Sequence, residues 1–317
     1  MRTFNPLAAK GNRNPEYDTT PRSHFSTFKL DLQAAALEFV GTTFFLLLGL
    51  GGIQAVSSES GDGPPASTVE KVLYISTCMG LSLLVSAWLF FRVTGALFNP
   101  NISLALLLVG LIRPVRFVLY CIAQMAGAIA AAALVLALTP GRLASNNVLA
   151  TGVNSAQGVF IEMFITAALV LAVLMLAAER HNSTPFAPIG IGLTLFACHL
   201  WAVFYTGACM NTARAFGPAA VTGFPYTHHW VYWVGPFLGS VLGATFYNLL
   251  RHYRYWNFAP GEATVDNGNA SGAPLAGGNN HAISGTDGYN DRNAAGTSGA
   301  GMGDSKLNGR TANDSAV

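Results

Sequence analysis

The sequence is poor in charge. Of its 317 residues, 10 % are Asp, Glu, Lys or Arg, against about 25 % in an average soluble protein. Hydrophobic residues make up 51 %, and the mean hydropathy of +0.41 is in the range of membrane proteins. These values exclude an ordinary soluble enzyme and a disordered scaffold. The net charge of +2 is too small to indicate a nucleic-acid partner.

Cysteine is also scarce, and no two cysteines form a CxxC pair. The four that occur lie in or beside apolar stretches: Cys78, Cys121, Cys198 and Cys209. A disulfide framework and a structural zinc site are therefore not expected. We interpret these cysteines as small buried hydrophobic residues, and the sequence indicates neither a metal nor a cofactor.

Long hydrophobic runs are present instead. Six segments are long enough to cross a bilayer core of about 30 Å as helices. They are residues 34–54, 72–92, 115–138, 157–178, 187–206 and 231–250. A transmembrane β-barrel is excluded, because its strands would be about ten residues long with alternating polarity. The fold class predicted is an all-α polytopic membrane protein.

Basic residues are concentrated before the first span, after the second, after the fourth and after the sixth. By the positive-inside rule, both termini are expected to be cytoplasmic. We predict a cytoplasmic N-terminal segment at 1–32, a membrane domain at 33–252 and a tail at 257–317. The tail is rich in Gly, Asn, Ala and Ser, a composition that cannot form a core, so a disordered cytoplasmic tail is expected.

The sequence contains an internal repeat. Residues 95–99 read Gly-Ala-Leu-Phe-Asn and residues 207–211 read Gly-Ala-Cys-Met-Asn. Each is followed by an apolar stretch of about ten residues, too short to span. A Glu with a Thr four residues later occurs in the first and fourth spans, at Glu38 and Glu162. Because each half has three spans, the second half must be inverted, as in many channels and transporters.

The two short stretches are predicted to be half-helices that enter the membrane from opposite sides. Asn99 and Asn211 stand at their starts, where Asn is a favoured N-cap. The positive ends of two helix dipoles would then face each other near the midplane. Amide donors in that place can orient a water molecule and oppose a cation or proton. Arg214 is a further candidate, since a charge at membrane depth is costly and usually functional.

On these motifs the chain resembles the aquaporin, or major intrinsic protein, family. The family carries two Asn-Pro-Ala motifs, and this chain has Asn99-Pro100-Asn101 and Asn211-Thr212-Ala213. Further family-like features are Glu38, Glu162, His199 and the runs 123–127, 216–218 and 233–236. The resemblance covers roughly residues 33–252. It implies six transmembrane helices and two re-entrant half-helices, a homotetramer with one pore per subunit, and no cofactor.

The resemblance also implies a selectivity filter of Met79, His199, Ala208 and Arg214. Arg214 would donate to the permeant and repel cations, and Ala208 would present its backbone carbonyl. Water channels usually carry Phe at the position of Met79. The glycerol-conducting branch carries Gly at the position of His199 and Asp directly after the Arg, where this chain has Ala215. The water-selective branch, of fungal type, is therefore favoured.

The remaining family-like residues concern support of the pore. By the resemblance, Glu38 and Glu162 accept hydrogen bonds from the backbones of the re-entrant loops. Asn101 and Thr212 depart from the family pattern, and we hypothesise that they bond to each other where the two motifs touch. The alternative is that Asn101 crowds or redirects the pore donors and slows the channel.

The expected function is a passive water channel that moves water down an osmotic gradient. The plasma membrane is the expected location, with an internal membrane as the alternative. Two other functions remain open: a channel for another small neutral solute, such as hydrogen peroxide, ammonia or a small polyol, and a non-conducting membrane scaffold. An ion-coupled transporter would need charged pairs in the spans beyond the symmetric Glu38 and Glu162, and the sequence has none.

Overall fold

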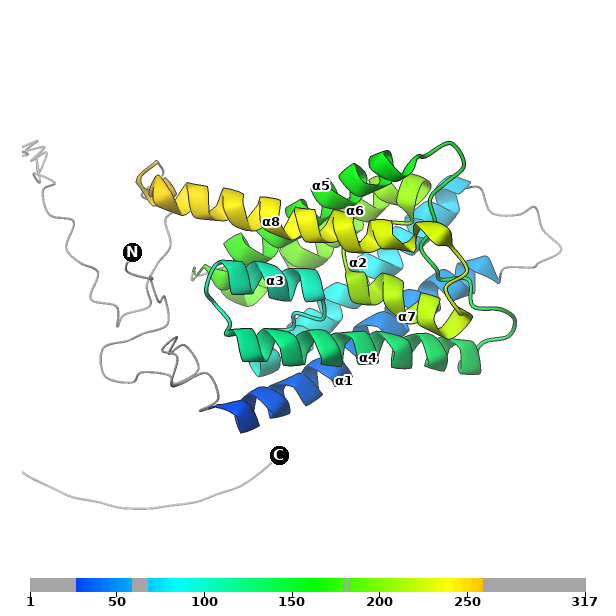
Figure 1. Ribbon diagram of the computed structural model, residues 1–317, viewed down its shortest axis with the longest axis horizontal. Helices are drawn as coiled ribbons and strands as arrows, with labels where there is room; N and C mark the ends of the chain where they lie inside the picture. The colour runs from blue at the N-terminus through cyan, green and yellow to red at the C-terminus, as the bar shows by residue number, and fades with distance from the viewer. Residues whose placement is uncertain (1–26, 59–67, 180, 182, 259–317) are drawn as a thin grey trace, which may run out of the picture. The chain divides into compact units, whose positions relative to one another are not determined.

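The computed structural model describes residues 27–58, 68–179, 181 and 183–258 (Figure 1). Every regular element in this part is a helix. The longer helices are α1 (Phe28–Ser57), α2 (Thr68–Thr94), α3 (Pro100–Leu108), α4 (Pro114–Leu138), α5 (Ser155–Val173), α6 (Ala187–Thr206), α7 (Thr212–Thr222) and α8 (Val231–His252). The short ones are the π-helical turn η3 (Leu174–Ala178) and the 3₁₀ turns η4 (Thr184–Phe186), η5 (Thr227–Trp230) and η6 (Tyr255–Asn257).

Six of these helices coincide with the six predicted spans. Five are long and apolar enough to cross a membrane: α1, α2, α4, α5 with η3, and α6 with η4. The sixth, α8, is less apolar, but its 22 residues extend about 33 Å at 1.5 Å per residue, the thickness of a bilayer core. The all-α polytopic prediction is confirmed.

Helix α1 begins at Phe28, inside the segment 1–32 that the sequence placed before the membrane domain. The extra turn is held by Asp31, which is fully buried. The Thr27 hydroxyl donates to Asp31 Oδ2 at 3.0 Å. Arg113, the N-cap residue of α4, and Arg116 in its first turn lie against the same carboxylate. A charged residue therefore extends the first helix, which hydrophobicity alone did not predict.

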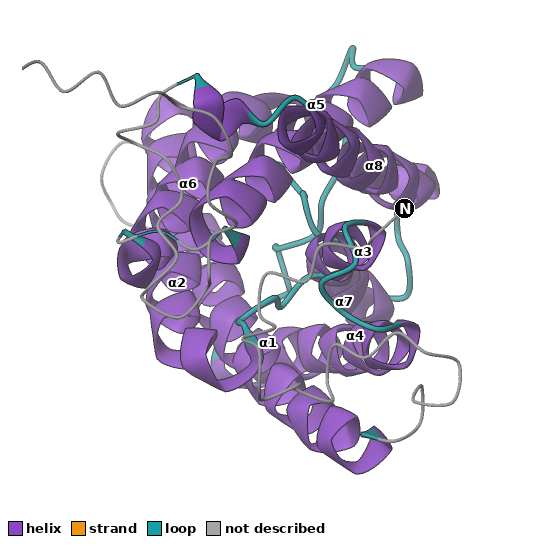
Figure 2. Ribbon diagram, turned by 90° about the vertical axis from the view of Figure 1, so that its left-hand side faces the viewer, coloured by secondary structure: helices purple, strands orange, loops and turns teal. Residues whose placement is uncertain are grey.

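The helices are arranged as two similar halves. In the first half α1 packs along α4, and in the second half α5 packs along α8 in the same way. The two halves meet where α2 packs against α6. In Figure 2, α3 and α7 overlap, with long helices above them, below them and on their left. This is the repeat that the sequence predicted.

The half-helices α3 and α7 have nine and eleven residues, too few to cross a bilayer. They lie end to end between α4 and α8, with their N-terminal ends toward each other (Figure 1). Asn99 and Asn211 are their N-caps, both with extended backbone. Two helix N-termini therefore meet in the interior, as the motif spacing predicted.

Two glycines allow the paired long helices to approach closely. A Cβ built on Gly127 of α4 would lie 2.8 Å from the Phe39 carbonyl oxygen of α1. A Cβ on Gly239 of α8 would lie 2.5 Å from the Met163 carbonyl oxygen of α5. Real Cβ atoms do not tolerate such distances, so each position requires glycine.

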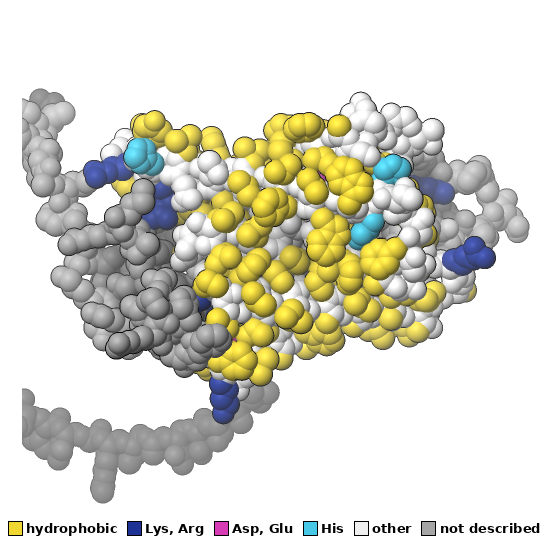
Figure 3. Space-filling view, in the orientation of Figure 1, with side chains coloured by type: hydrophobic (Ala, Val, Ile, Leu, Met, Phe, Trp, Pro, Cys, Tyr) yellow, Lys and Arg dark blue, Asp and Glu magenta, His cyan; other side chains and the backbone are white. Residues whose placement is uncertain are grey.

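The visible outer face has a hydrophobic middle (Figure 3). Hydrophobic side chains cover its centre, while Lys, Arg and His lie toward its two ends. Large exposed apolar residues occur on every long helix, for example Leu89, Ile122, Phe160, Leu193 and Phe237. A surface of this kind is expected where lipid or another subunit covers the protein. Apart from residues 257 and 258, the tail predicted at 257–317 lies outside the described residues.

Candidate functional site

A narrow, largely enclosed cavity lies where the two halves meet, with a volume of about 30 Å³, room for about one or two water molecules. Its wall is apolar along the long helices and polar at the two loops. The apolar wall includes Phe45 of α1, Met79, Leu83, Ala87 and Phe91 of α2, Leu169 and Val173 of α5, Ala177 of η3, and Ile191 and Leu195 of α6. Asn99, Asn211 and Arg214 supply polar side chains.

Asn99 and Asn211 make equivalent bonds in the two halves. The Oδ1 atom of each accepts from backbone N–H in the first turn of its own half-helix. Asn99 Nδ2 donates to the Met210 carbonyl at 2.8 Å, and Asn211 Nδ2 donates to the Phe98 carbonyl at 2.9 Å. A primary amide has two N–H groups, so each Asn has a second N–H beyond this contact. Both side chains line the cavity.

The loops before the half-helices share an uncommon backbone. Ala96 and Phe98 in the first loop, and Ala208 and Met210 in the second, have positive φ, between 48° and 54°. Non-glycine residues rarely adopt this conformation, and it is concentrated at functional sites. Because these loops are not helical, consecutive residues face the same space, and residues 95–97 all line the cavity.

Glu38 and Glu162 lie behind these loops and are fully buried. Each accepts hydrogen bonds from two consecutive backbone N–H groups: Leu97 and Phe98 for Glu38 (3.1 and 2.8 Å), and Cys209 and Met210 for Glu162 (2.9 Å each). The two glutamates thus occupy equivalent places against equivalent loops. Every hydrogen-bond partner of these carboxylates is a donor, so both oxygens of each accept.

Sequence reasoning missed a second set of contacts to the same loops. The hydroxyls of Thr94 and Thr206 each donate to the Glu of their own half at 2.6 Å. The hydroxyls of Tyr120 and Tyr232 donate to the carbonyls of these threonines, at 3.2 and 2.8 Å. A signal was present in the sequence, because a Thr precedes the Gly-Ala pair in both loops.

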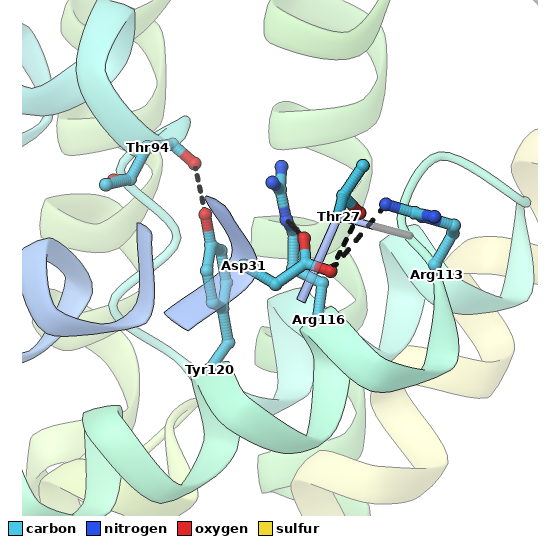
Figure 4. A network of polar contacts seen from close by, with 6 residues as sticks. All are labelled: Thr27, Asp31, Thr94, Arg113, Arg116 and Tyr120. Atoms are coloured by element: carbon cyan, nitrogen blue, oxygen red, sulfur yellow. Dashed lines mark hydrogen bonds and ion pairs between the residues drawn. The ribbon is translucent and has the colours of Figure 1, made fainter. Parts of the chain in front are cut away.

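In the first half these contacts continue into a buried ion-pair cluster (Figure 4). Arg116 Nε donates to Asp31 Oδ1 at 2.8 Å, and Arg113 Nη2 lies 3.6 Å from Asp31 Oδ2. The Arg116 guanidinium also lies over the Tyr120 ring, 5.8 Å from its centroid. Figure 4 shows Tyr120 between this cluster and Thr94. Charged groups at one end of α1 and α4 are thereby connected to the first loop.

Arg214 is held by the segment that precedes α5. Its side chain is buried, and Nη1 donates to the Ser145 carbonyl at 2.9 Å and to Asn147 Oδ1. Arg214 Nε has no hydrogen-bond partner among the described residues. Two contacts fix the guanidinium at the cavity wall and leave donor capacity for another molecule. Nothing in the sequence identified Asn147, because it lies in a loop far from the motif.

The other three residues predicted for the filter are all buried. Met79 lines the cavity with Arg214, whereas His199 and Ala208 are not part of its wall. His199 stands one turn after Leu195 on α6, and its Nδ1 lies 2.9 Å from the Leu195 carbonyl. Since a carbonyl only accepts, Nδ1 carries the proton in this contact. His199 Nε2 has no partner among the described residues.

The major intrinsic protein family model matches residues 24–247. The chain belongs to the aquaporin family. Aquaporin-1 of Laccaria bicolor is 68 % identical over 256 residues, covering 80 % of this chain and 82 % of that protein. Aquaporin-7 of Botryotinia fuckeliana is 44 % identical over 234 residues, covering 72 % and 52 %. These relatives support an aquaporin of fungal type.

The fold is shared with a solved aquaporin-family structure. The aquaglyceroporin from Plasmodium falciparum matches with a TM-score of 0.60 at 17 % identity, covering 72 % of this chain and 98 % of that chain. Membership of the family supports an integral membrane channel for water or small solutes. In the described residues no cluster of three His, Cys, Asp or Glu could hold a metal.

The two departures from the aquaporin motif are in contact. The backbone N–H and the hydroxyl of Thr212 both donate to Asn101 Oδ1, at 2.9 and 3.0 Å. The predicted bond across the contact of the two motifs is therefore present. Neither side chain is part of the cavity wall, so Asn101 does not narrow that cavity.

Proposed function

We propose that this aquaporin is a passive water channel. The observation that carries the proposal is that Asn99, Asn211 and Arg214 meet in one cavity with room for about one or two water molecules. Water in single file loses neighbours and needs hydrogen-bond donors in exchange. The second N–H of each Asn and the unpartnered Nε of Arg214 supply them. The apolar stripes on α2, α5 and α6 bind water weakly and let it move on.

The same residues are expected to exclude cations and protons. The N-termini of α3 and α7 carry positive partial charge, and they face each other at the two Asn side chains. Arg214 adds a full positive charge to the same cavity. Donors on both Asn residues would also turn the water oxygen toward them, which interrupts a continuous proton-conducting chain.

A second candidate is a channel for hydrogen peroxide. Met79 supports it, because a flexible thioether adapts its shape better than the Phe that water channels usually carry there. Ammonia and small polyols are less favoured. By the family pattern, His199 and Ala215 stand where a glycerol channel carries Gly and Asp.

The role of each site residue follows from this function. We propose that Met79, His199, Ala208 and Arg214 form the selectivity filter. Glu38 and Glu162 would support the re-entrant loops without moving protons, because both face only donors. The channel domain would be residues 33–252, extended to Phe28 by α1.

We also propose a homotetramer with one pore per subunit and with both termini cytoplasmic. The plasma membrane is the proposed location. The exposed apolar faces of the long helices support contact with lipid or a second subunit. The concentration of basic residues in alternate loops supports the orientation.

Stopped-flow light scattering on proteoliposomes tests the function. Under a sucrose gradient, vesicles with the protein are expected to shrink several times faster than empty ones. Arg214→Ala is expected to admit glycerol as well, because it removes a charge and bulk from the filter. Arg142→Ala is the matched control, since Arg142 is exposed and outside the cavity.

Shrinkage no faster than in empty vesicles, from protein shown to be folded, would contradict the water channel. Uptake of peroxide in the same vesicles would then establish the second candidate. Absence of flux for water, peroxide and ammonia would leave the non-conducting scaffold.

A further inference from the structure

The second positions of the two motifs differ in their backbone hydrogen-bond donors. Pro100 begins α3 and has no backbone N–H, whereas Thr212 begins α7 and has one. N–H groups in the first turn of a helix have no partner within the helix. Water is not available to solvate them in a membrane interior. Thr212 therefore brings a buried donor that proline lacks, and this donor needs an acceptor.

Asn101 provides the acceptor. Its Oδ1 receives both the N–H and the hydroxyl of Thr212. The next two N–H groups of α7, at Ala213 and Arg214, donate to Asn211 Oδ1 at 2.9 and 3.3 Å. The first turn of α7 is thus fully paired, and one of its partners comes from the other half of the repeat.

The pair lies behind the pore, on the side of α8. The Thr212 hydroxyl is also 3.1 Å from the Tyr232 carbonyl, and the Ser240 hydroxyl donates to the Asn101 carbonyl at 2.9 Å. Neither Asn101 nor Thr212 lines the cavity. Any effect of the pair on a permeating molecule must therefore pass through its neighbours.

Those neighbours are the two pore asparagines. The Asn101 backbone N–H donates to Asn99 Oδ1 at 2.8 Å, and Thr212 directly follows Asn211 in the chain. Asn99 and Asn211 each donate to a backbone carbonyl in the loop of the other half, and these bonds join the two loops. The Asn101–Thr212 contact joins the helices themselves. A bond between the helix starts fixes their spacing, and hence the directions of the two amide groups.

We propose that Asn101 and Thr212 are a positioning pair. They set the orientation of Asn99 and Asn211 in the pore, and each residue is tolerated only when the other is present. This inference rests on the proposed channel function and deepens it, because it names residues outside the cavity that control its donors.

The backbone itself would accept proline at position 212. Asn211 has φ −153° and ψ 107°, nearly the same as Asn99 before Pro100, at φ −154° and ψ 117°. This extended conformation is the one that a residue before proline prefers. The obstacle is Asn101, because a proline Cδ would replace the amide hydrogen that points at its Oδ1. Thr212→Pro alone would create a clash and also leave that oxygen without both donors.

A four-member cycle tests the proposal: the parent chain, Asn101→Ala, Thr212→Pro and the double variant, which carries Asn-Pro-Ala in both motifs. Water permeability per folded channel and proton leak, followed with an entrapped pH-sensitive dye, are measured in the same vesicles. Each single variant is expected to lose about fivefold in permeability, equivalent to about one net hydrogen bond, and to leak more protons. The double variant is expected to return to within about twofold of the parent.

Two further variants identify the donor that matters. Thr212→Ser keeps both donors and is expected to behave as the parent chain. Thr212→Ala keeps the backbone N–H and loses the hydroxyl, so a smaller loss than in Thr212→Pro is expected. A purely structural role would change the yield of folded channels and leave the ratio of water flux to proton leak unchanged.

Additive losses in the double variant would overturn the proposal, as would a faster, equally selective Asn101→Ala. If Thr212→Pro does not fold, recovery of folding on addition of Asn101→Ala supports mutual dependence, and continued misfolding contradicts it. The thermal unfolding midpoints of the same four chains show the coupling without any flux measurement. Absence of flux in the parent chain would therefore refute the channel function, while the unfolding midpoints would still test the coupling between Asn101 and Thr212.

Discussion

Tyr120 and Tyr232 make the same bond to a re-entrant loop, but the residues that pack on their rings differ between the two halves. Tyr120 lies beneath Arg116, which the buried Asp31 holds in place. Tyr232 lies beside His229, with ring centroids 6.3 Å apart. His229 in turn contacts the ring of Phe224 at 5.1 Å.

The sequence shows where the two halves diverge. Arg116 stands four residues before Tyr120, and His228 stands four before Tyr232. Close to the midplane both halves keep the same Asn, Glu, Thr and Tyr contacts. The two halves therefore keep the same contacts where their half-helices must meet, and their residues differ toward the ends of the helices.

The largest expected effect comes from removing a loop-supporting carboxylate. Both oxygens of the Glu162 carboxylate accept hydrogen bonds. In Glu162→Gln an NH₂ group replaces one of them, so a donor would face another donor in either orientation of the new amide. Loss of about 4 kcal/mol in stability and of water flux is expected. In Glu38→Gln the loss should be smaller, because Gln124 also bonds Glu38 and can turn its own carbonyl toward the new amide.

Thermal unfolding in detergent and vesicle flux measure this difference. Glu70→Gln is the control, since Glu70 is exposed at the start of α2. A larger loss in Glu38→Gln than in Glu162→Gln would show that Gln124 does not compensate for the lost carboxylate.

The next effect concerns helix packing. Gly239→Ala is expected to destabilise by about 3 kcal/mol, because its Cβ would lie 2.5 Å from a backbone oxygen of α5. Gly127→Ala should cost less, with its closest contact at 2.8 Å. Gly51→Ala is a matched control within α1, where a Cβ meets nothing within 4 Å and helix propensity improves. Equal unfolding midpoints for all three variants would contradict this ranking.

A smaller effect is expected from Asp31→Asn, which affects the first half alone. The amide keeps an oxygen for Arg116, but two arginines lose their buried counter-charge. The free energy of unfolding is therefore expected to fall by about 2 kcal/mol. The matched position in the second half is Ser155, which stands seven residues before Glu162, just as Asp31 stands seven residues before Glu38. Ser155→Ala should have little effect on stability. Hydrogen exchange should increase at residues 95–98 in Asp31→Asn. Unchanged exchange there would show that the cluster does not support the loop.

The smallest effect is a pH dependence confined to the second half. Burial lowers the pKa of His229, which lies in η5 outside the spans. The unfolded chain therefore binds a proton at higher pH than the folded chain does. Stability is fully retained above pH about 6.5 and falls as the pH decreases below it. His229→Phe should reduce this dependence of the unfolding midpoint, and His228→Phe, at an exposed residue, should not.

Much of the architecture could be predicted from the sequence. Hydrophobic length located the spans, and the repeated Gly-Ala-x-x-Asn located the half-helices, because both signals are local. The contact between Asn101 and Thr212 was also predictable, since two departures from one symmetric motif face each other. The start of α1 was harder to predict, because the buried Asp31 is stabilised by ion pairs with arginines far away in the chain.

The hydrogen-bond partners of Thr94, Tyr120 and Asn147 could not be predicted from local sequence. Thr and Tyr in apolar spans have many possible partners, and only packing shows which carbonyl or carboxylate they contact. Asn147 lies in a connecting segment without a motif, and its bond to Arg214 depends on how that segment folds back.

The sequence by itself determined that this chain is an inverted-repeat membrane channel. Hydrophobic runs and a repeated motif are properties of the chain alone, and the bilayer permits few structures that satisfy a buried backbone. The tertiary structure alone decided which groups satisfy that backbone and how the donors are aimed. Hydrogen bonds between residues more than a hundred positions apart, such as Asn99 to Met210 and Asn101 to Thr212, exist only once the two half-helices meet.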